Sequence, residues 1–253
     1  MTHPPVGRET RAPMRLLLGS GGLSTPARRE AFSRELGDFL GPVSRVLFVP
    51  YALADHDKYL EMIVSRGFHA GRALEGIHRA RSAVRAVADA EAIYVGGGNT
   101  FRLLDALERL KLLRPIRRRV EAGMPFVGIS AGTNLACPTI RTTNDMPIVW
   151  PKSAEALDLV PFQINPHYVD GAFHLKTGRR YLPYGGETRD VRLTEFHEMN
   201  EVPILALREG SILRVEGKRA RVTGASGARL FLQGVPPVDL AIGADVSYLL
   251  RRR

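Results

Sequence analysis

The segment GISAG at residues 128–132 has the G-x-S-x-G pattern, in which a serine lies on a tight turn between a strand and a helix. An apolar run predicts a buried strand before it, and the Thr-Asn pair after it is typical of a helix start. Such a turn would hold the Ser130 hydroxyl at the carboxyl edge of a sheet, beside N–H groups that stabilise negative charge. The alternative is a glycine-rich turn with an incidental serine, but the elements on both sides favour a nucleophile.

A second glycine-rich segment, GGGNT at residues 96–100, also follows a strand pattern and precedes a helical one. Three glycines permit positive φ angles and close approach of a ligand to the backbone. A phosphate-binding loop would end in G-K-[ST] or contain G-x-G-x-x-G, and this segment does neither. We therefore expect the N–H groups of Gly97 and Gly98 to form an oxyanion hole together with that of Ala131.

A serine hydroxyl needs a general base, and three of the seven histidines follow Ser130: His167, His174 and His197. His167 follows an apolar run and an Asn-Pro pair, which places it at a strand end or turn, where the active sites of α/β sheets lie. We therefore predict that His167 is the base. The pattern around His197 predicts a surface residue on a helix.

The acid that would orient this histidine is not determined by spacing, because Asp145, Glu187 and Glu209 all lie in suitable polar segments. The sequence has no H-E-x-x-H motif, no His/Asp cluster and no cysteine pair. We therefore expect no metal site and no other cofactor.

The first half of the chain alternates short apolar runs with amphipathic segments, which is typical of a mostly parallel sheet with helices on both faces. We expect strands at residues 14–19, 46–49, 92–95 and 125–129, with a weaker one at 70–74. We expect helices at residues 27–40, 59–66, 80–88, 101–112 and 114–122.

The second half has short strand patterns joined by glycine-containing turns, at residues 204–207, 212–215, 220–222 and 230–232. They predict an antiparallel C-terminal extension of the same sheet. No linker divides the chain, so we expect one α/β domain over residues 14–250, after a flexible polar leader at residues 1–13.

The composition, with 44% hydrophobic and 25% charged residues, is that of an ordinary globular protein. No apolar run could span a bilayer or act as a secretory signal, and the single cysteine, Cys137, fits a reducing cytoplasm.

The net charge of +10 raises the alternative of a non-enzymatic module that binds nucleic acid. The positive residues are scattered, however, and the densest helical cluster, at residues 114–119, fits a solvated face, so we expect neither a nucleic-acid nor a membrane partner.

Four segments resemble the peptidase E family of α-aspartyl dipeptidases, in the same order. They are the nucleophile segment at residues 130–149, VGGGNTF at 95–101, QINPH at 163–167 and GETR at 186–189. The resemblance covers roughly residues 14–234. It implies a flavodoxin-like sheet, as in class I glutamine amidotransferase domains, and metal-free cytoplasmic hydrolysis of dipeptides that begin with aspartate.

The resemblance also implies roles for individual residues: Ser130 as the nucleophile, His167 as the general base and Glu209 as the acid that orients it. Asp145 matches a family aspartate that is linked to activity, and its role stays open between orienting His167 and another function. The order Ser, His, Glu differs from the Ser, acid, His order of α/β-hydrolases.

For the substrate, we expect Arg189 to pair with the aspartate side chain, because a guanidinium binds a carboxylate through two hydrogen bonds. Glu187 is a candidate partner for the free α-amino group, and Asn99 for a contact beside the glycine loop. Residues 169–184 form a longer segment than the family has there. Another acidic substrate, such as a cyanophycin-type β-aspartyl peptide or an N-acyl amino acid, is therefore the alternative; the enzyme could be a monomer or a homodimer.

Overall fold

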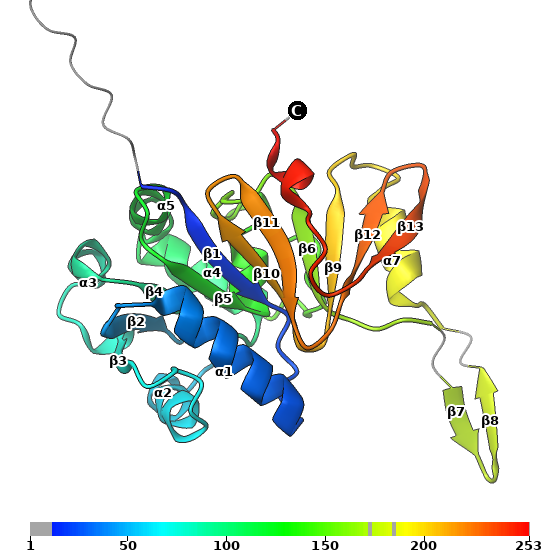
Figure 1. Cartoon of the computed structure of the whole chain (residues 1–253), viewed down its shortest axis with the longest axis horizontal. Helices are drawn as coiled ribbons and strands as arrows, with labels where there is room; N and C mark the ends of the chain where they lie inside the picture. The colour runs from blue at the N-terminus through cyan, green and yellow to red at the C-terminus, as the bar shows by residue number, and fades with distance from the viewer. Residues whose placement is uncertain (1–11, 172–173, 184–185, 253) are drawn as a thin grey trace, which may run out of the picture.

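The apolar runs form a seven-stranded sheet in the order β11-β10-β1-β5-β4-β2-β3 (Figure 1). The computed structural model describes residues 12–171, 174–183 and 186–252, so most of the leader expected at residues 1–13 lies outside the described residues. The five strands from β1 to β3 in this order are parallel, and β10 and β11 add to the β1 edge in antiparallel fashion. The strands are β1 (Arg15–Gly19), β2 (Arg45–Val49), β3 (Ala73–Gly76), β4 (Ile93–Val95), β5 (Phe126–Ile129), β10 (Ser211–Glu216) and β11 (Arg219–Gly224).

The helices begin where the sequence supplies capping residues. Thr25 caps α1, whose first residue is Pro26, and Asn99 caps α4 with its side chain. The helices are α1 (Pro26–Leu40), α2 (His56–Ser65), α3 (Ala83–Asp89), α4 (Thr100–Arg109), α5 (Leu113–Glu121), α6 (Ala131–Leu135) and α7 (Arg189–Phe196), with short 3-10 turns η1 (Ile77–Arg79) and η2 (Ser247–Leu250). None of the helices among the described residues has the length and apolar character needed to cross a membrane.

Neighbouring residues of β1 point to opposite faces of the sheet, and both faces are covered. Leu17 packs with Phe32 of α1 and other residues of α1 and α2. Leu16 packs instead with Leu103 of α4 and Ile116 of α5. This is the burial expected of a parallel sheet between two helix layers, and Figure 1 shows α1 lying across one face.

A second sheet of four strands lies beside the first, in the order β13-β12-β9-β6. Its strands are β6 (Gln163–Tyr168), β9 (Ile204–Arg208), β12 (Ala228–Leu232) and β13 (Val235–Leu240). Ile164 and Leu205 join the same apolar cluster as Leu16, whereas Ala206 and Tyr168 pack under α7 on the other side. The second sheet thus shares one core with the first and is covered by α7.

The expected extension of a single sheet is right for two of the four C-terminal strands. β10 and β11 extend the first sheet, but β9 and β12 belong to the second, where β9 pairs in parallel with β6. β9 is buried on both sides, so its sequence is a continuous apolar run that predicts a strand but does not identify the neighbouring strand.

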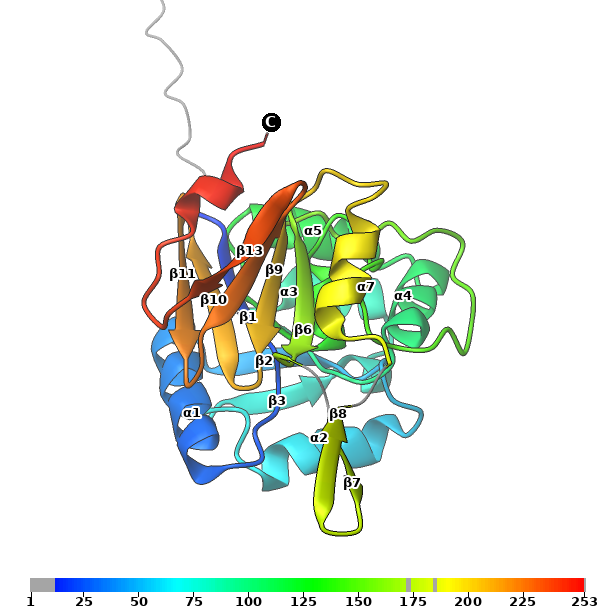
Figure 2. The same ribbon diagram turned by 90° about the vertical axis from the view of Figure 1, so that its right-hand side faces the viewer.

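The long segment at residues 169–184 contains a two-stranded hairpin, β7 (His174–Thr177) and β8 (Arg180–Pro183). Both views show it projecting from the rest of the molecule (Figures 1 and 2). Residues 174–182 are exposed.

Two helical glycines give opposite predictions for the same substitution. A Cβ on Gly132 of α6 would lie 2.2 Å from the Val95 carbonyl oxygen, whereas one on Gly37 of α1 would meet nothing closer than 3.9 Å. We expect Gly132→Ala to lower the free energy of unfolding by about 1–3 kcal/mol through overpacking. The control, Gly37→Ala, should raise it by about 0.5–1 kcal/mol. Urea unfolding of both variants checks this, and a Gly132→Ala protein as stable as the wild type would contradict the close packing of α6 on β4.

Candidate active site

Three loops meet at the carboxyl edge of the first sheet, because β5 pairs with β1 on one side and with β4 on the other. They are residues 19–22 at the end of β1, residues 96–99 after β4 and the turn at Ser130 after β5. Ligand sites of open α/β sheets lie at this edge.

Ser130 lies on the sharp strand-to-helix turn that the pattern predicts, with φ 55° and ψ −107°. The turn is possible only with glycine on either side: a Cβ on Gly128 would lie 2.5 Å from the Gly132 carbonyl oxygen. The Ser130 N–H donates to the Gly19 carbonyl oxygen at 2.9 Å, which ties the turn to the end of β1. A residue in such a rare conformation needs support of this kind from its surroundings.

A continuous chain of hydrogen bonds joins three of the candidate residues. His167 Nε2 lies 2.7 Å from Ser130 Oγ, and His167 Nδ1 lies 2.8 Å from Glu209 Oε1. In this arrangement the serine hydroxyl can donate to Nε2 while Nδ1–H donates to the carboxylate. The side chains of His167 and Glu209 remain 37% and 30% exposed, so the pair is open to a ligand.

His167 is the last residue but one of β6 and lies at an irregularity of the strand, where the sequence predicts a strand end or turn. The pairing of β6 with β9 shifts between Asn165 and Tyr168, and His167 has a φ of 57°. A bulge of this kind turns a side chain out of the regular alternation. Here it directs the imidazole toward Ser130.

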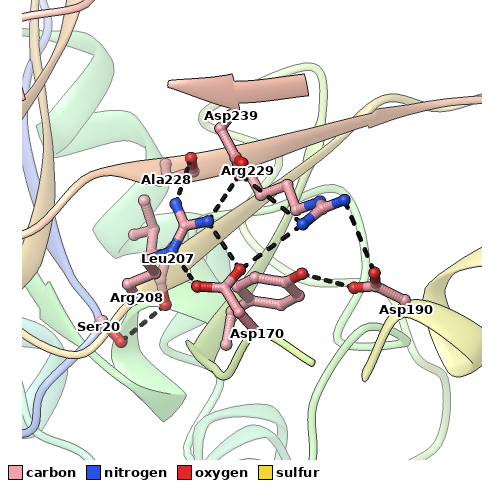
Figure 3. Close-up of polar contacts among 9 residues, drawn as sticks. Ser20, Asp170, Asp190, Leu207, Arg208, Ala228, Arg229 and Asp239 are labelled. Carbon is pink, nitrogen blue, oxygen red and sulfur yellow. Dashed lines mark hydrogen bonds and ion pairs between the residues drawn. The ribbon is translucent and has the colours of Figure 1, made fainter. Parts of the chain in front are cut away.

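Polar contacts hold the strands on either side of this irregularity (Figure 3). Arg208, the residue before Glu209, binds both carboxylate oxygens of Asp170 at 2.7 Å and an oxygen of Asp239 at 2.6 Å. The hydrogen bonds with Asp170 raise the pKa of Arg208, and in turn they lower the pKa of Asp170. The chain just after β6 is thereby joined to the end of β9.

Asp145 does not contact the His167 ring. Its carboxylate accepts hydrogen bonds from the N–H of Thr100 at 2.8 Å and from the hydroxyls of Thr100 and Thr143 at 2.6 and 3.1 Å. A carboxylate at this place stabilises the N-terminus of α4, the helix that follows the glycine loop. Asp145 is thus placed to support that loop, and among the three acid candidates Glu209 is the one at the histidine.

The glycine loop packs directly on the serine turn. A Cβ on Gly97 would lie 3.1 Å from Ser130 Cβ, and Gly98 has a φ of 131° and lies against the Ala52 carbonyl. The N–H groups of Gly98 and Ala131 have no acceptor in the described part of the chain. Both are therefore available to an oxyanion.

Asn99 is occupied by local contacts. Its Oδ1 accepts from the N–H of Arg102 at 3.0 Å, and its Nδ2 donates to the Met146 carbonyl oxygen at 2.8 Å. This side chain caps α4 and holds the segment after Asp145, so in this structure it supports the loop.

Arg189 is the first residue of α7 and lines a cavity of about 70 Å³ with Arg141, Asn144 and Asn165, among other residues. Within the described ranges no carboxylate pairs with Arg189. Burial lowers its pKa, and the charge of Arg192 adds to the effect. Asn144, one of the lining residues, donates from Nδ2 to the Pro166 carbonyl oxygen at 2.7 Å, so the cavity lies beside the segment that carries His167.

Glu187 and His197 both lie near the ends of α7. Glu187 is exposed and pairs with Arg192 at 3.0 Å, so it is not free for a substrate amine in this structure. His197 is 6% exposed and its Nε2 lies 3.0 Å from the Val202 carbonyl oxygen, so the prediction of a surface residue is wrong. The helix pattern ends at His197, which turns inward at the C-terminal cap of α7.

The sequence interpretation missed the loop after β1. A Cβ on Gly21 would lie 3.0 Å from His167 Cε1, and one on Gly22 would lie 1.9 Å from Glu209 Oε2. The Gly-Ser-Gly-Gly sequence directly after a buried strand was the available signal, since it marks a loop at the functional edge of the sheet.

Across the part of the chain that the structure describes, no cluster of three or more histidine, cysteine, aspartate or glutamate side chains could hold a metal ion.

Comparisons with known proteins identify the family. The family model described as "Peptidase family S51" matches residues 15–223, and the chain belongs to this family. It is 51% identical over 215 residues to "Peptidase E" of Streptomyces coelicolor, covering 84% of each chain. It is 46% identical over 240 residues to "Probable alpha-aspartyl dipeptidase" of Drosophila melanogaster, covering 94% of this chain and 97% of the relative. The resemblance seen in the sequence is therefore confirmed, and the chain is a peptidase.

Solved structures confirm the fold class. A putative peptidase E protein from Listeria monocytogenes superposes with a TM-score of 0.63 at 23% identity, over 85% of this chain and 100% of the other. A peptidase from an acI-B1 Actinobacterium gives 0.65 at 17% identity, over 93% and 97%.

Two isosteric substitutions separate the roles of the carboxylates. Glu209→Gln removes the charge beside His167, and we expect kcat for a dipeptide to fall by about 10²–10⁴-fold with little change in stability. Asp145→Asn weakens the N-terminal cap of α4, and we expect about 1 kcal/mol lower stability, with kcat of the folded protein within a few-fold of wild type. Steady-state kinetics and thermal unfolding of both variants test this, and the reverse pattern would assign the histidine to Asp145.

Proposed function

We propose that this chain is a serine dipeptidase that hydrolyses dipeptides with an N-terminal aspartate, Asp-Xaa, through Ser130, His167 and Glu209. The observation that carries the proposal is the unbroken hydrogen-bond chain of 2.7 and 2.8 Å from the serine through the histidine to the glutamate. Relatives named peptidase E and probable alpha-aspartyl dipeptidase support it.

In the proposed reaction, His167 accepts the proton of Ser130 as Oγ attacks the carbonyl carbon of the aspartyl residue. Glu209 fixes the ring and stabilises the imidazolium. The N–H groups of Ala131 and of Gly98 in the glycine loop receive the oxyanion. The imidazolium then protonates the departing amine, and a water molecule activated by the same histidine releases aspartate from Ser130.

The cavity at Arg189 supports a preference for an acidic first residue. It is lined by Arg141, Arg189 and Arg192, and of these only Arg192 has a carboxylate partner among the described residues. A cationic cavity beside the segment that carries His167 favours a carboxylate ligand. We propose that Arg189 binds the side-chain carboxylate of the substrate aspartate. Glu187 and Asn99 would contact the substrate only after giving up contacts that they make in this structure.

We further propose that residues 14–250 work as one domain in the cytoplasm, as a monomer or homodimer, without a metal, another cofactor or a nucleic-acid partner. The serine and histidine supply the nucleophile and the proton transfer that the reaction needs. Cys137 is buried, and burial raises the pKa of its thiol to about 12, so it is suited to a structural place in the core.

The test is release of free aspartate from Asp-Leu, with β-Asp-Leu and Ala-Leu alongside, for wild type and Arg189→Gln. We expect wild type to cleave Asp-Leu alone, and Arg189→Gln to lower kcat/KM for Asp-Leu by about 10- to 100-fold, because a charge-assisted hydrogen bond is lost.

The matched control is Arg118→Gln, which removes the same charge from an exposed position of α5 and should leave kcat/KM unchanged. Cleavage of β-Asp-Leu instead of Asp-Leu would favour the cyanophycin-type alternative. Equal cleavage of Ala-Leu, or an Arg189→Gln enzyme with wild-type kcat/KM, would contradict the proposed specificity.

A further inference from the structure

The loop at residues 19–22 touches every member of the proposed triad. The Gly19 carbonyl oxygen accepts the N–H of Ser130 at 2.9 Å, Gly21 lies against the His167 ring, and Gly22 lies against the Glu209 carboxylate. The loop is also fixed to the chain after Glu209, since the N–H of Gly210 donates to the Gly21 carbonyl oxygen at 2.9 Å. It is therefore a common support for three residues that come from different strands.

Ser20 is the polar side chain at the centre of this loop, and it is completely buried. Its hydroxyl oxygen accepts the backbone N–H of His167 at 2.8 Å and donates to the Leu207 carbonyl oxygen at 3.0 Å. Figure 3 shows the second of these bonds, beside the Arg208 contacts. One hydroxyl thus joins the end of β1 to β6 at His167, and to β9 at Leu207, two residues before Glu209.

The backbone of His167 depends on such a partner. With a φ of 57°, this residue lies in a region that a side chain other than glycine rarely adopts, at a cost of about 1–3 kcal/mol. The shift in pairing between Asn165 and Tyr168 takes its N–H out of the regular ladder with β9. A buried N–H without an acceptor would add a further penalty, and the Ser20 hydroxyl is the acceptor that removes it.

We infer that Ser20 is a positioning residue for the general base of this reaction. It contacts neither the Ser130 hydroxyl nor the His167 ring nitrogens; it holds the His167 backbone so that Nε2 reaches Ser130 and Nδ1 reaches Glu209 together. The inference rests on the proposed Ser130–His167–Glu209 mechanism. Without the Ser20 hydroxyl, the backbone at His167 is free to relax toward the regular strand, which would move the ring away from Ser130.

The test compares Ser20→Ala with Ser211→Ala. Ser211 is a good control because it is also fully buried and lies nearby, and its backbone carbonyl accepts the Ser20 N–H at 2.9 Å. Its hydroxyl, however, has no hydrogen-bond partner among the described residues. Both substitutions therefore remove a buried hydroxyl oxygen from similar surroundings. Only Ser20→Ala also removes a hydrogen bond to the backbone of His167.

For Ser20→Ala we expect kcat on Asp-Leu to fall by about 10- to 100-fold, since small displacements of a catalytic group have effects of this size. KM should stay within about three-fold, because the Arg189 cavity is untouched. The downfield proton resonance of the His167–Glu209 hydrogen bond should broaden or shift in the NMR spectrum. Ser211→Ala should match wild type in all three measurements, and circular dichroism of both variants confirms that folded protein is compared.

A folded Ser20→Ala enzyme with wild-type kcat and an unchanged downfield resonance would overturn the inference. So would an equal loss of kcat in Ser211→Ala, because it would show that any small change in this core lowers activity. Ser130→Ala run in parallel keeps the two proposals apart: if it retains activity the mechanism itself fails, whereas loss there with full activity in Ser20→Ala removes only the role of Ser20.

Discussion

The rest of the structure depends on one constraint: the imidazole of His167 must lie between two hydrogen-bond partners, one at each ring nitrogen. His167 must reach Ser130 and Glu209 at once, at 2.7 and 2.8 Å. Ser130 directly follows β5 of the first sheet, whereas His167 belongs to β6 of the second, and Glu209 lies where the chain passes from β9 to β10. The active site therefore exists only if the two sheets keep a fixed relation. The shared apolar core supplies that relation, because residues of both sheets pack in one cluster.

Two of the five non-glycine residues with a positive φ in the described part of the chain lie at this place. Both Ser130 and His167 have positive φ angles, 55° and 57°, and each is held by a hydrogen bond of its N–H to the loop after β1. Each such conformation costs about 1–3 kcal/mol, which the surrounding structure must outweigh. The ion pair of Arg208, at the end of β9, with Asp170, two residues after β6, adds a second link between these strands close to His167. Rigid surroundings of this kind keep a catalytic group within the few tenths of an ångström that proton transfer requires.

Much of the fold and part of the site could be predicted from the sequence. The strands and helices of the first half follow directly from the alternation of apolar and amphipathic runs, and the serine turn follows from the glycines around Ser130. Strand partners could not be predicted, because a doubly buried strand such as β9 is apolar throughout and carries no information about its neighbour. The inward turn of His197 and the capping role of Asp145 depend on contacts with residues distant in sequence or on the loop conformation. The role of Ser20 depends on a bond across 147 positions, which no local pattern contains.

The most direct test of the account is the rate at which a fluorophosphonate that reacts with activated serines labels the protein, measured by intact mass for wild type and His167→Ala. We expect a single label on wild type, mapped by peptide mass to Ser130, and a rate lower by about 10³-fold or more in the variant, because an unassisted serine hydroxyl is a poor nucleophile. A wild-type protein that stays unlabelled at Ser130, or a His167→Ala variant that reacts at the wild-type rate, would contradict the claim that this histidine activates this serine.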